Sequence, residues 1–100
     1  MISGQVLANF FEKAIAELPS RADAEGNIHP TDMAEALPTV VSAAGGGELA
    51  FETAIKFLAD AMAATGVRDA GRYLTNTRDK LSLYEAHAYL SHARHIVMAL

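Results

Sequence analysis

The clearest pattern in the sequence is an apolar stripe close to its start. Apolar residues recur there every three or four positions, the spacing that places side chains on one face of a helix. Ser3 suits the cap of the first turn, and Pro19 disfavours helical geometry in the residue before it. The pattern therefore predicts a helix over residues 3–18. Its apolar face consists of Val6, Leu7, Phe10, Phe11, Ala14, Ile15 and Leu18.

The same spacing predicts two further long helices, over residues 48–65 and 82–100. Gly66 suits the left-handed position that closes the first of them. Ser82 and Glu85 have the capping-box spacing that opens the second. Small alanines lie on or beside the inner stripes of all three helices, where they would let helices approach closely. The few large residues Phe10, Phe11, Phe51 and Leu58 are expected to fill the core.

Shorter helices are predicted between the long ones, over residues 31–37 and 68–75. Residues 39–44 are expected to add another turn or two. Three consecutive glycines over residues 45–47 predict a flexible elbow, because glycine loses much conformational entropy on ordering. No stretch alternates apolar and polar residues as a strand does. We therefore expect one all-α domain over residues 1–100, a small bundle of four to five helices.

Composition supports a helical core and removes several classes of chemistry. Apolar residues make up 51% of the chain, and twenty residues are alanine. Cysteine is absent, which excludes a disulfide framework, a thiolate zinc site and a cysteine nucleophile. No apolar run reaches the length of a membrane span, and no secretory signal is visible at the start. We expect a cytoplasmic protein that does not contact a membrane.

Charge is distributed unevenly along the chain. The formal net charge is −4, the wrong sign for a generic nucleic-acid binder. Residues 1–66 carry three basic and nine acidic side chains, whereas residues 67–100 carry five basic and three acidic ones. Such an asymmetry would steer a charged partner or let two copies dock head to tail. A short chain also shows such an asymmetry by chance, and this alternative stays open.

A polar loop follows the first predicted helix and resembles the calcium-binding loop of the EF-hand family. The stretch from Asp23 to Ile28 lies between two helical segments and has the glycine of that loop at residue 26. The resemblance implies calcium ligands at Asp23, Glu25 and Asp32. Arg21 stands where the family has its first carboxylate, which opposes calcium binding. An ordinary polar turn is the alternative.

A second stretch resembles a helix-turn-helix. It joins residues 58–62 to Gly66 and to the segment from Gly71 to Leu74. The resemblance implies a DNA-binding regulator in which the residues after the turn enter the major groove. The side chains that would contact DNA are Arg68, Arg72 and Arg78. The turn is about two residues longer than that family's, so a basic loop at a helix end is the alternative.

The last predicted helix carries three of the four histidines, His87, His92 and His95. His92 and His95 have a spacing that would let them share a metal ion, but no third ligand is apparent. Ser91 lies four residues from both His87 and His95, a pairing that is common by chance. We therefore expect no metal, no cofactor and no enzymatic activity.

The outward side of the same helix has too few charges for a free surface. Glu85 and Arg94 are its only formally charged residues. Tyrosine, histidine and methionine supply contact area in protein interfaces. A central helix buried on two sides is the alternative. The predicted interface comprises Tyr84, His87, Ser91, His95 and Met98, flanked by Tyr89.

The sequence therefore favours a non-enzymatic protein-binding module, alone or as a homodimer, that inhibits or regulates a larger protein complex. In size and composition alone, the chain resembles phage-encoded inhibitors of host defence complexes such as anti-CRISPR proteins. A helix-turn-helix DNA-binding regulator is the alternative function, although the acidic net charge disfavours nucleic acid as a partner.

Overall fold

The computed structural model describes residues 2–100 as a bundle of five helices, which confirms the predicted fold class. The long helices are α1 (Gly4–Arg21), α3 (Glu48–Ala64) and α5 (Leu83–Met98). In the sequence, α2 (Pro30–Ala43) stands between α1 and α3. The short helix α4 (Ala70–Tyr73) precedes α5. Two strands, β1 (Asn27–Ile28) and β2 (Leu81–Ser82), pair in antiparallel register.

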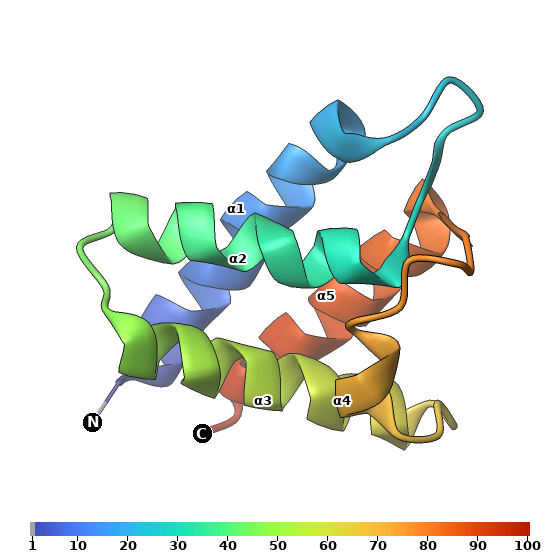
Figure 1. Ribbon diagram of the computed structural model, residues 1–100. Coiled ribbons are helices and arrows are strands. Elements are labelled where there is room, and N and C mark those ends of the chain that lie inside the picture. Colours follow the sequence, from blue (N-terminus) through green and yellow to red (C-terminus); the bar gives the residue numbers. More distant parts are fainter. Residues whose placement is uncertain (1) are drawn as a thin grey trace.

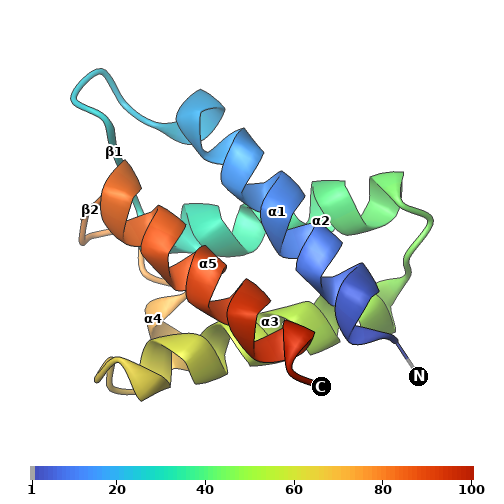
Figure 2. The same ribbon diagram turned by 180° about the vertical axis from the view of Figure 1, so that it is seen from behind.

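The helices form two layers around the core. α1 and α5 run antiparallel, side by side, and make the most extensive packing in the molecule (Figure 2). α2 and α3 cover the other side of the core (Figure 1). The start of α1, the start of α3 and the end of α5 therefore lie at one end of the bundle. The two strands and α4 lie at the other end.

The core is apolar and rich in small residues. The buried side chains include Phe10, Phe11 and Leu58, as predicted, whereas Phe51 is only partly buried against the core. The alanines predicted for the inner stripes are fully buried and bring the helices close together. They are Ala14, Ala54, Ala61, Ala86 and Ala93. Val6, predicted for the inner stripe, is instead 43% exposed.

Pro19 and Pro38 lie inside helices, although the sequence predicts that a helix ends before each of them. α1 continues through Pro19 to Arg21, and α2 continues through Pro38 to Ala43. The missing N–H of Pro19 costs one hydrogen bond in the last turn. Packing compensates, because Leu18 is buried and the Arg21 guanidinium donates to the carbonyl of Glu35 on α2 at 3.2 Å.

The helix ends otherwise follow the expected signals. Ser3 accepts from the N–H of Val6, and Ser82 accepts from the N–H of Glu85. Gly66 closes α3 with φ +97°, as a left-handed residue. The Gly45–Gly47 connection joins α2 to α3, and its first two N–H groups bond to carbonyls of the last turn of α2. Its flexibility stays a prediction.

The strands are the element that the sequence did not predict. Ile28 and Leu81 are buried where the two loops meet, and two residues in each strand are too few to show alternation.

Among the helices of residues 2–100, none is both long and apolar enough to span a bilayer.

Candidate functional site

The outward side of α5 is exposed along its whole length. Tyr84 is 85% exposed and Met98 is 52% exposed, and His87 and His95 are also exposed. Ser91 is partly exposed between them. These five residues form what we call the α5 face. The alternative of a helix buried on two sides does not hold, because only the inner stripe of α5 is covered.

Tyr89 differs from the other residues predicted for this interface. Its ring is half-buried and packs against the core. Tyr89 lies three residues after Ala86 and four before Ala93, both fully buried, so it shares their side of the helix. It therefore does not belong to the α5 face.

The histidines of α5 do not assemble a metal site. The Ser91 hydroxyl lies 3.4 Å from Nδ1 of His87, and this pair sits on the open helix surface. Across residues 2–100, no three histidine, aspartate or glutamate side chains come together in a way that would hold a metal ion. His92 is partly buried, whereas His87 and His95 are exposed.

An apolar groove lies at the end of the bundle where α1 and α3 start and α5 ends. It has a volume of about 370 Å³. Leu49 and Leu100 line it and are each 73% exposed. The exposed Met98 stands two residues before Leu100, so the α5 face and the groove meet at the end of α5. The lining residues are Ile2, Leu7, Leu49, Thr53, Phe57 and Leu100.

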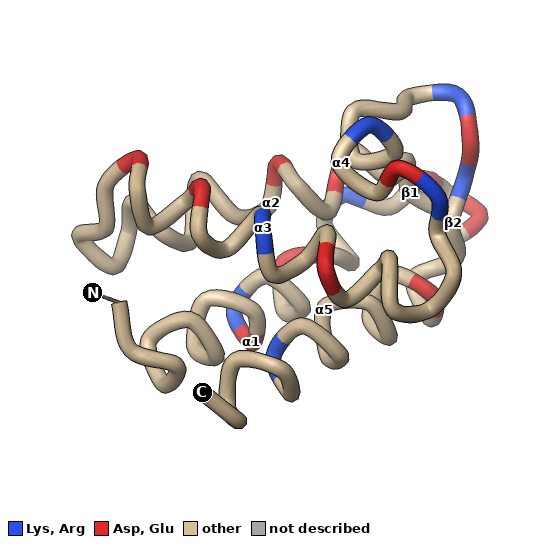
Figure 3. Tube along the Cα trace, turned by 90° about the horizontal axis from the view of Figure 1, so that it is seen from below, with Lys and Arg blue, Asp and Glu red and all other residues tan. Residues whose placement is uncertain are grey.

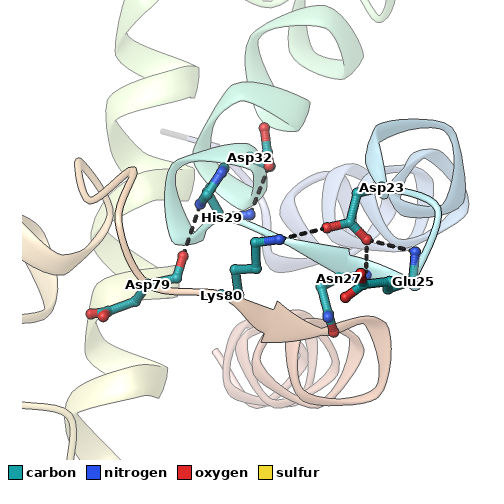
Figure 4. A network of polar contacts seen from close by, with 7 residues as sticks. All are labelled: Asp23, Glu25, Asn27, His29, Asp32, Asp79 and Lys80. Carbon is teal, nitrogen blue, oxygen red and sulfur yellow. Dashed lines mark hydrogen bonds and ion pairs between the residues drawn. The ribbon is translucent and has the colours of Figure 1, made fainter.

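The opposite end of the bundle holds a polar network between the two loops (Figure 4). One carboxylate oxygen of Asp23 accepts from the N–H groups of Glu25 and Asn27 at 2.9 and 3.0 Å. The other oxygen accepts from the ammonium of Lys80 at 3.0 Å. These contacts, led by the N–H of Asn27, lower the pKa of the Asp23 carboxyl to about 2. The same pairing raises the pKa of Lys80.

This network shows how far the EF-hand resemblance extends. The predicted helix–loop–helix is present, since α1 and α2 flank the loop. The predicted calcium ligands are not all free to bind an ion, because the Asp32 carboxylate accepts from the N–H of His29 at 2.8 Å and caps α2. Arg21 pairs with Glu17 and Glu35. A fixed cation, Lys80, already neutralises Asp23, so these residues do not fit a calcium ion.

The loop ends are tied together by a second contact. Nδ1 of His29, at the start of α2, bonds to the carbonyl oxygen of Asp79 at 2.8 Å (Figure 4). The N–H of Thr31 donates to the carbonyl of Asn76 at 3.3 Å. With the β1–β2 pairing, these bonds fix the segment before α5 against the start of α2.

The three arginines of the predicted DNA contact lie around α4. Arg68, Arg72 and Arg78 are all exposed, and Figure 3 shows basic positions at α4 and along the segment that leads to β2. The helix that follows the turn after α3 is α4, which has 4 residues. One turn is too short to serve as a recognition helix in the major groove. The structure brings the arginines together but does not form a helix-turn-helix.

Sequence reasoning missed the apolar groove and the Asp23–Lys80 pair. The signal for the groove was the apolar Leu49, two residues after the glycine elbow and in the first turn of a helix, where a polar residue is usual. The Asp23–Lys80 pair joins residues 57 positions apart, and no local pattern predicts such a contact.

In comparisons with known proteins, no family model, no curated protein and no solved structure matches the chain significantly.

Proposed function

We propose that this chain is a non-enzymatic protein-binding module of the cytoplasm, which inhibits or regulates a larger protein or protein complex. Its contact surface comprises the α5 face and the apolar groove. The observation that carries this proposal is the exposure of large apolar side chains over both. Tyr84 is 85% exposed, Leu49 and Leu100 are each 73% exposed, and Met98 is 52% exposed.

Covering the α5 face would cost little desolvation of charge. Glu85 and Arg94 are the only formally charged residues of α5, and Arg94 is oriented towards Glu12 of α1, with 3.7 Å between the charged groups. Burial of apolar surface contributes about 25 cal/mol per Å². Tyrosine and methionine add contact area with adaptable shape. Exposed apolar side chains gathered around a groove are typical of protein contact sites.

Charge favours another protein over a second copy of this chain. The acidic Glu48 and Glu52 are exposed and stand next to the groove residues Leu49 and Thr53 in the sequence. A symmetric dimer through the groove would bring these carboxylates towards their own copies. The fitting occupant is a segment of another protein with apolar side chains for the groove and lysine or arginine beside them.

The experiment compares capture of cellular proteins by matched variants, followed by reconstitution. Tyr84→Ala and Leu49→Asp alter the contact surface, and Thr39→Ala alters an exposed residue of α2 as a control. We expect one protein to bind the unmodified chain and Thr39→Ala but not the other two variants. The purified pair should then lose about tenfold or more in affinity with each of them, as for an interface anchor.

Two results would contradict the proposal. One is that no captured protein depends on Tyr84 or Leu49, although both variants keep their helical circular dichroism. The other is that the unmodified chain self-associates in sedimentation experiments and Leu49→Asp abolishes this. The groove would then be covered by a second copy.

A further inference from the structure

Positive charge is concentrated beside α4. Arg68, Arg72, Arg78 and Lys80 provide half of the chain's eight lysines and arginines within thirteen residues. Lys80 pairs with Asp23, as Arg21 and Arg94 pair with other carboxylates. Arg68, Arg72 and Arg78 form no ion pair with any of residues 2–100 within 4.0 Å. Three exposed arginines therefore lie around α4 with no carboxylate within ion-pair distance.

These arginines border a hollow in the surface. A cavity of about 320 Å³ lies between α4 and β2 and has no apolar side chain in its lining. We call it the basic hollow. A second, smaller cavity of about 240 Å³ shares Arg72 and Asn76 with it and is also lined by Arg68. The lining residues of the basic hollow are Arg72, Thr75, Asn76, Thr77 and Arg78.

The backbone of this hollow is held in place by its own hydrogen bonds. The side-chain oxygen of Asn76 accepts from the N–H groups of Arg78 and Asp79, at 2.7 and 2.9 Å. The carbonyl of Asn76 accepts from Thr31 on α2, and the Thr75 hydroxyl donates to the carbonyl of Arg72 at 2.7 Å. The two guanidinium groups therefore extend from a fixed frame, which lowers the entropic cost of binding a ligand between them.

Donors remain free at the same place. Within the described part of the chain, neither the N–H nor the hydroxyl of Thr77 forms a hydrogen bond. The guanidinium forks of Arg72 and Arg78 bond to no acceptor among residues 2–100. A carboxylate is satisfied by a single fork, whereas a phosphate group presents three oxygens and a charge near −2.

We propose that the basic hollow binds a dianionic phosphate group, either the free ion or a phosphomonoester, with Arg72 and Arg78 as its two anchors and Thr77 as an additional donor. The ligand is compact, because the carboxylates of Asp69 and Asp79 flank the arginines and would repel an extended polyanion. The one-turn α4 likewise offers no helix to a DNA groove. Free phosphate and a phosphorylated side chain present the same chemistry, and the experiment separates them.

The test is a titration of the isotope-labelled protein at low salt, followed by amide resonances. Three probes are added in parallel: inorganic phosphate, O-phosphoserine and a short DNA duplex. We expect saturable shifts centred on residues 72–78 with the first two probes. Tighter binding of O-phosphoserine than of phosphate would indicate a phosphorylated side chain, and equal or weaker binding would indicate the free ion.

Variants distinguish a built site from general attraction. Arg72→Gln and Arg78→Gln should each weaken phosphate binding about tenfold or more, the loss expected for one charge-assisted hydrogen bond. Lys56→Gln removes the same charge from an exposed residue of α3 and should leave binding unchanged. Both arginines are exposed, so the variants should fold, which circular dichroism checks.

Three outcomes would overturn the proposal. The first is that millimolar phosphate shifts no resonance over residues 72–78 of the unmodified protein. The second is that Lys56→Gln weakens binding as much as the arginine variants do. The third is that the duplex binds more tightly than O-phosphoserine and depends on the same arginines, which would make the hollow a nucleic-acid contact.

Discussion

A single methyl group added at Gly4 should destabilise the whole bundle. Gly4 opens α1 and lies against the last turn of α5. Figure 2 shows the start of α1 beside the end of α5. A Cβ atom there would overlap the carbonyl oxygen of Val97 and lie 3.2 Å from its carbonyl carbon. It would also touch Cβ of Leu100 at 3.6 Å. The obstacle is backbone, so no side-chain rotation relieves it.

The expected magnitude follows from two opposing effects of Gly4→Ala. Helix propensity favours alanine over glycine by about 1 kcal/mol at most, and less in a first turn. Forcing an extra methyl group into a packed contact costs about 1–3 kcal/mol. The free energy of unfolding should therefore fall by roughly 1–2 kcal/mol. For a domain of this size, each kcal/mol lowers the melting temperature by about 4–8 °C.

The assay is thermal and urea unfolding of Gly4→Ala beside Gly71→Ala. Gly71 lies in α4, has no positive φ, and a Cβ atom there would meet nothing within 4 Å. Gly71→Ala should therefore be neutral or raise stability by up to about 1 kcal/mol. If Gly4→Ala melts at or above the temperature of the unmodified protein, α1 and α5 do not approach each other in this way.

Further substitutions test the core, a helix cap and the loop network. Leu90→Ala should lower the free energy of unfolding by about 2–5 kcal/mol in urea titrations, because Leu90 is fully buried. Ser82→Ala should lower it by about 1 kcal/mol in the same assay, because the N–H of Glu85 loses its acceptor; an unchanged midpoint would mean that the cap contributes nothing. The pKa of Asp23 is lowered from 3.8 to about 2 on folding. Its ionised form therefore stabilises the fold fully above pH 3.8, and this contribution is lost as the pH falls towards 2. Asp23→Asn should be less stable than the unmodified protein at pH 7, and urea midpoints of the two should converge between pH 4 and 2; a constant difference would refute the stabilising role of the ionised carboxylate.

Local signals in the sequence were sufficient for most of the fold. Ser3, Ser82 and Gly66 define helix ends through contacts with residues three to five positions away, so their roles are readable from spacing. The same holds for the buried alanines, whose helical period marks the inner faces. The helix ends predicted at Pro19 and Pro38 were wrong. Leu18 and the Val40–Val41 pair are buried, and this packing outweighs the local cost of proline.

The candidate sites depended on contacts that no local pattern reveals. The five residues of the α5 face could be located from the sequence, because a helix surface is periodic, whereas Tyr89, predicted with them, is half-buried. The apolar groove is formed where helix ends meet, so its shape depends on how the helices cross. The basic hollow is lined by the single segment 72–78, whose arginines the sequence indicated, but its frame depends on the bond from Thr31 of α2 to the carbonyl of Asn76. The EF-hand resemblance identified a real loop, but the ammonium that binds Asp23 comes from Lys80, far along the chain.

The antiparallel contact of α1 with α5 also bears on the kinetics of folding. Most small helical bundles pack helices that are neighbours in sequence, which keeps contact order low and folding fast. Here the first and last long helices make the most extensive contact. The two ends of the chain must therefore come together, which closes a loop of nearly the whole chain, before the core is complete. We expect stopped-flow refolding in the range of mixed α/β domains, slower than in bundles of sequential helices.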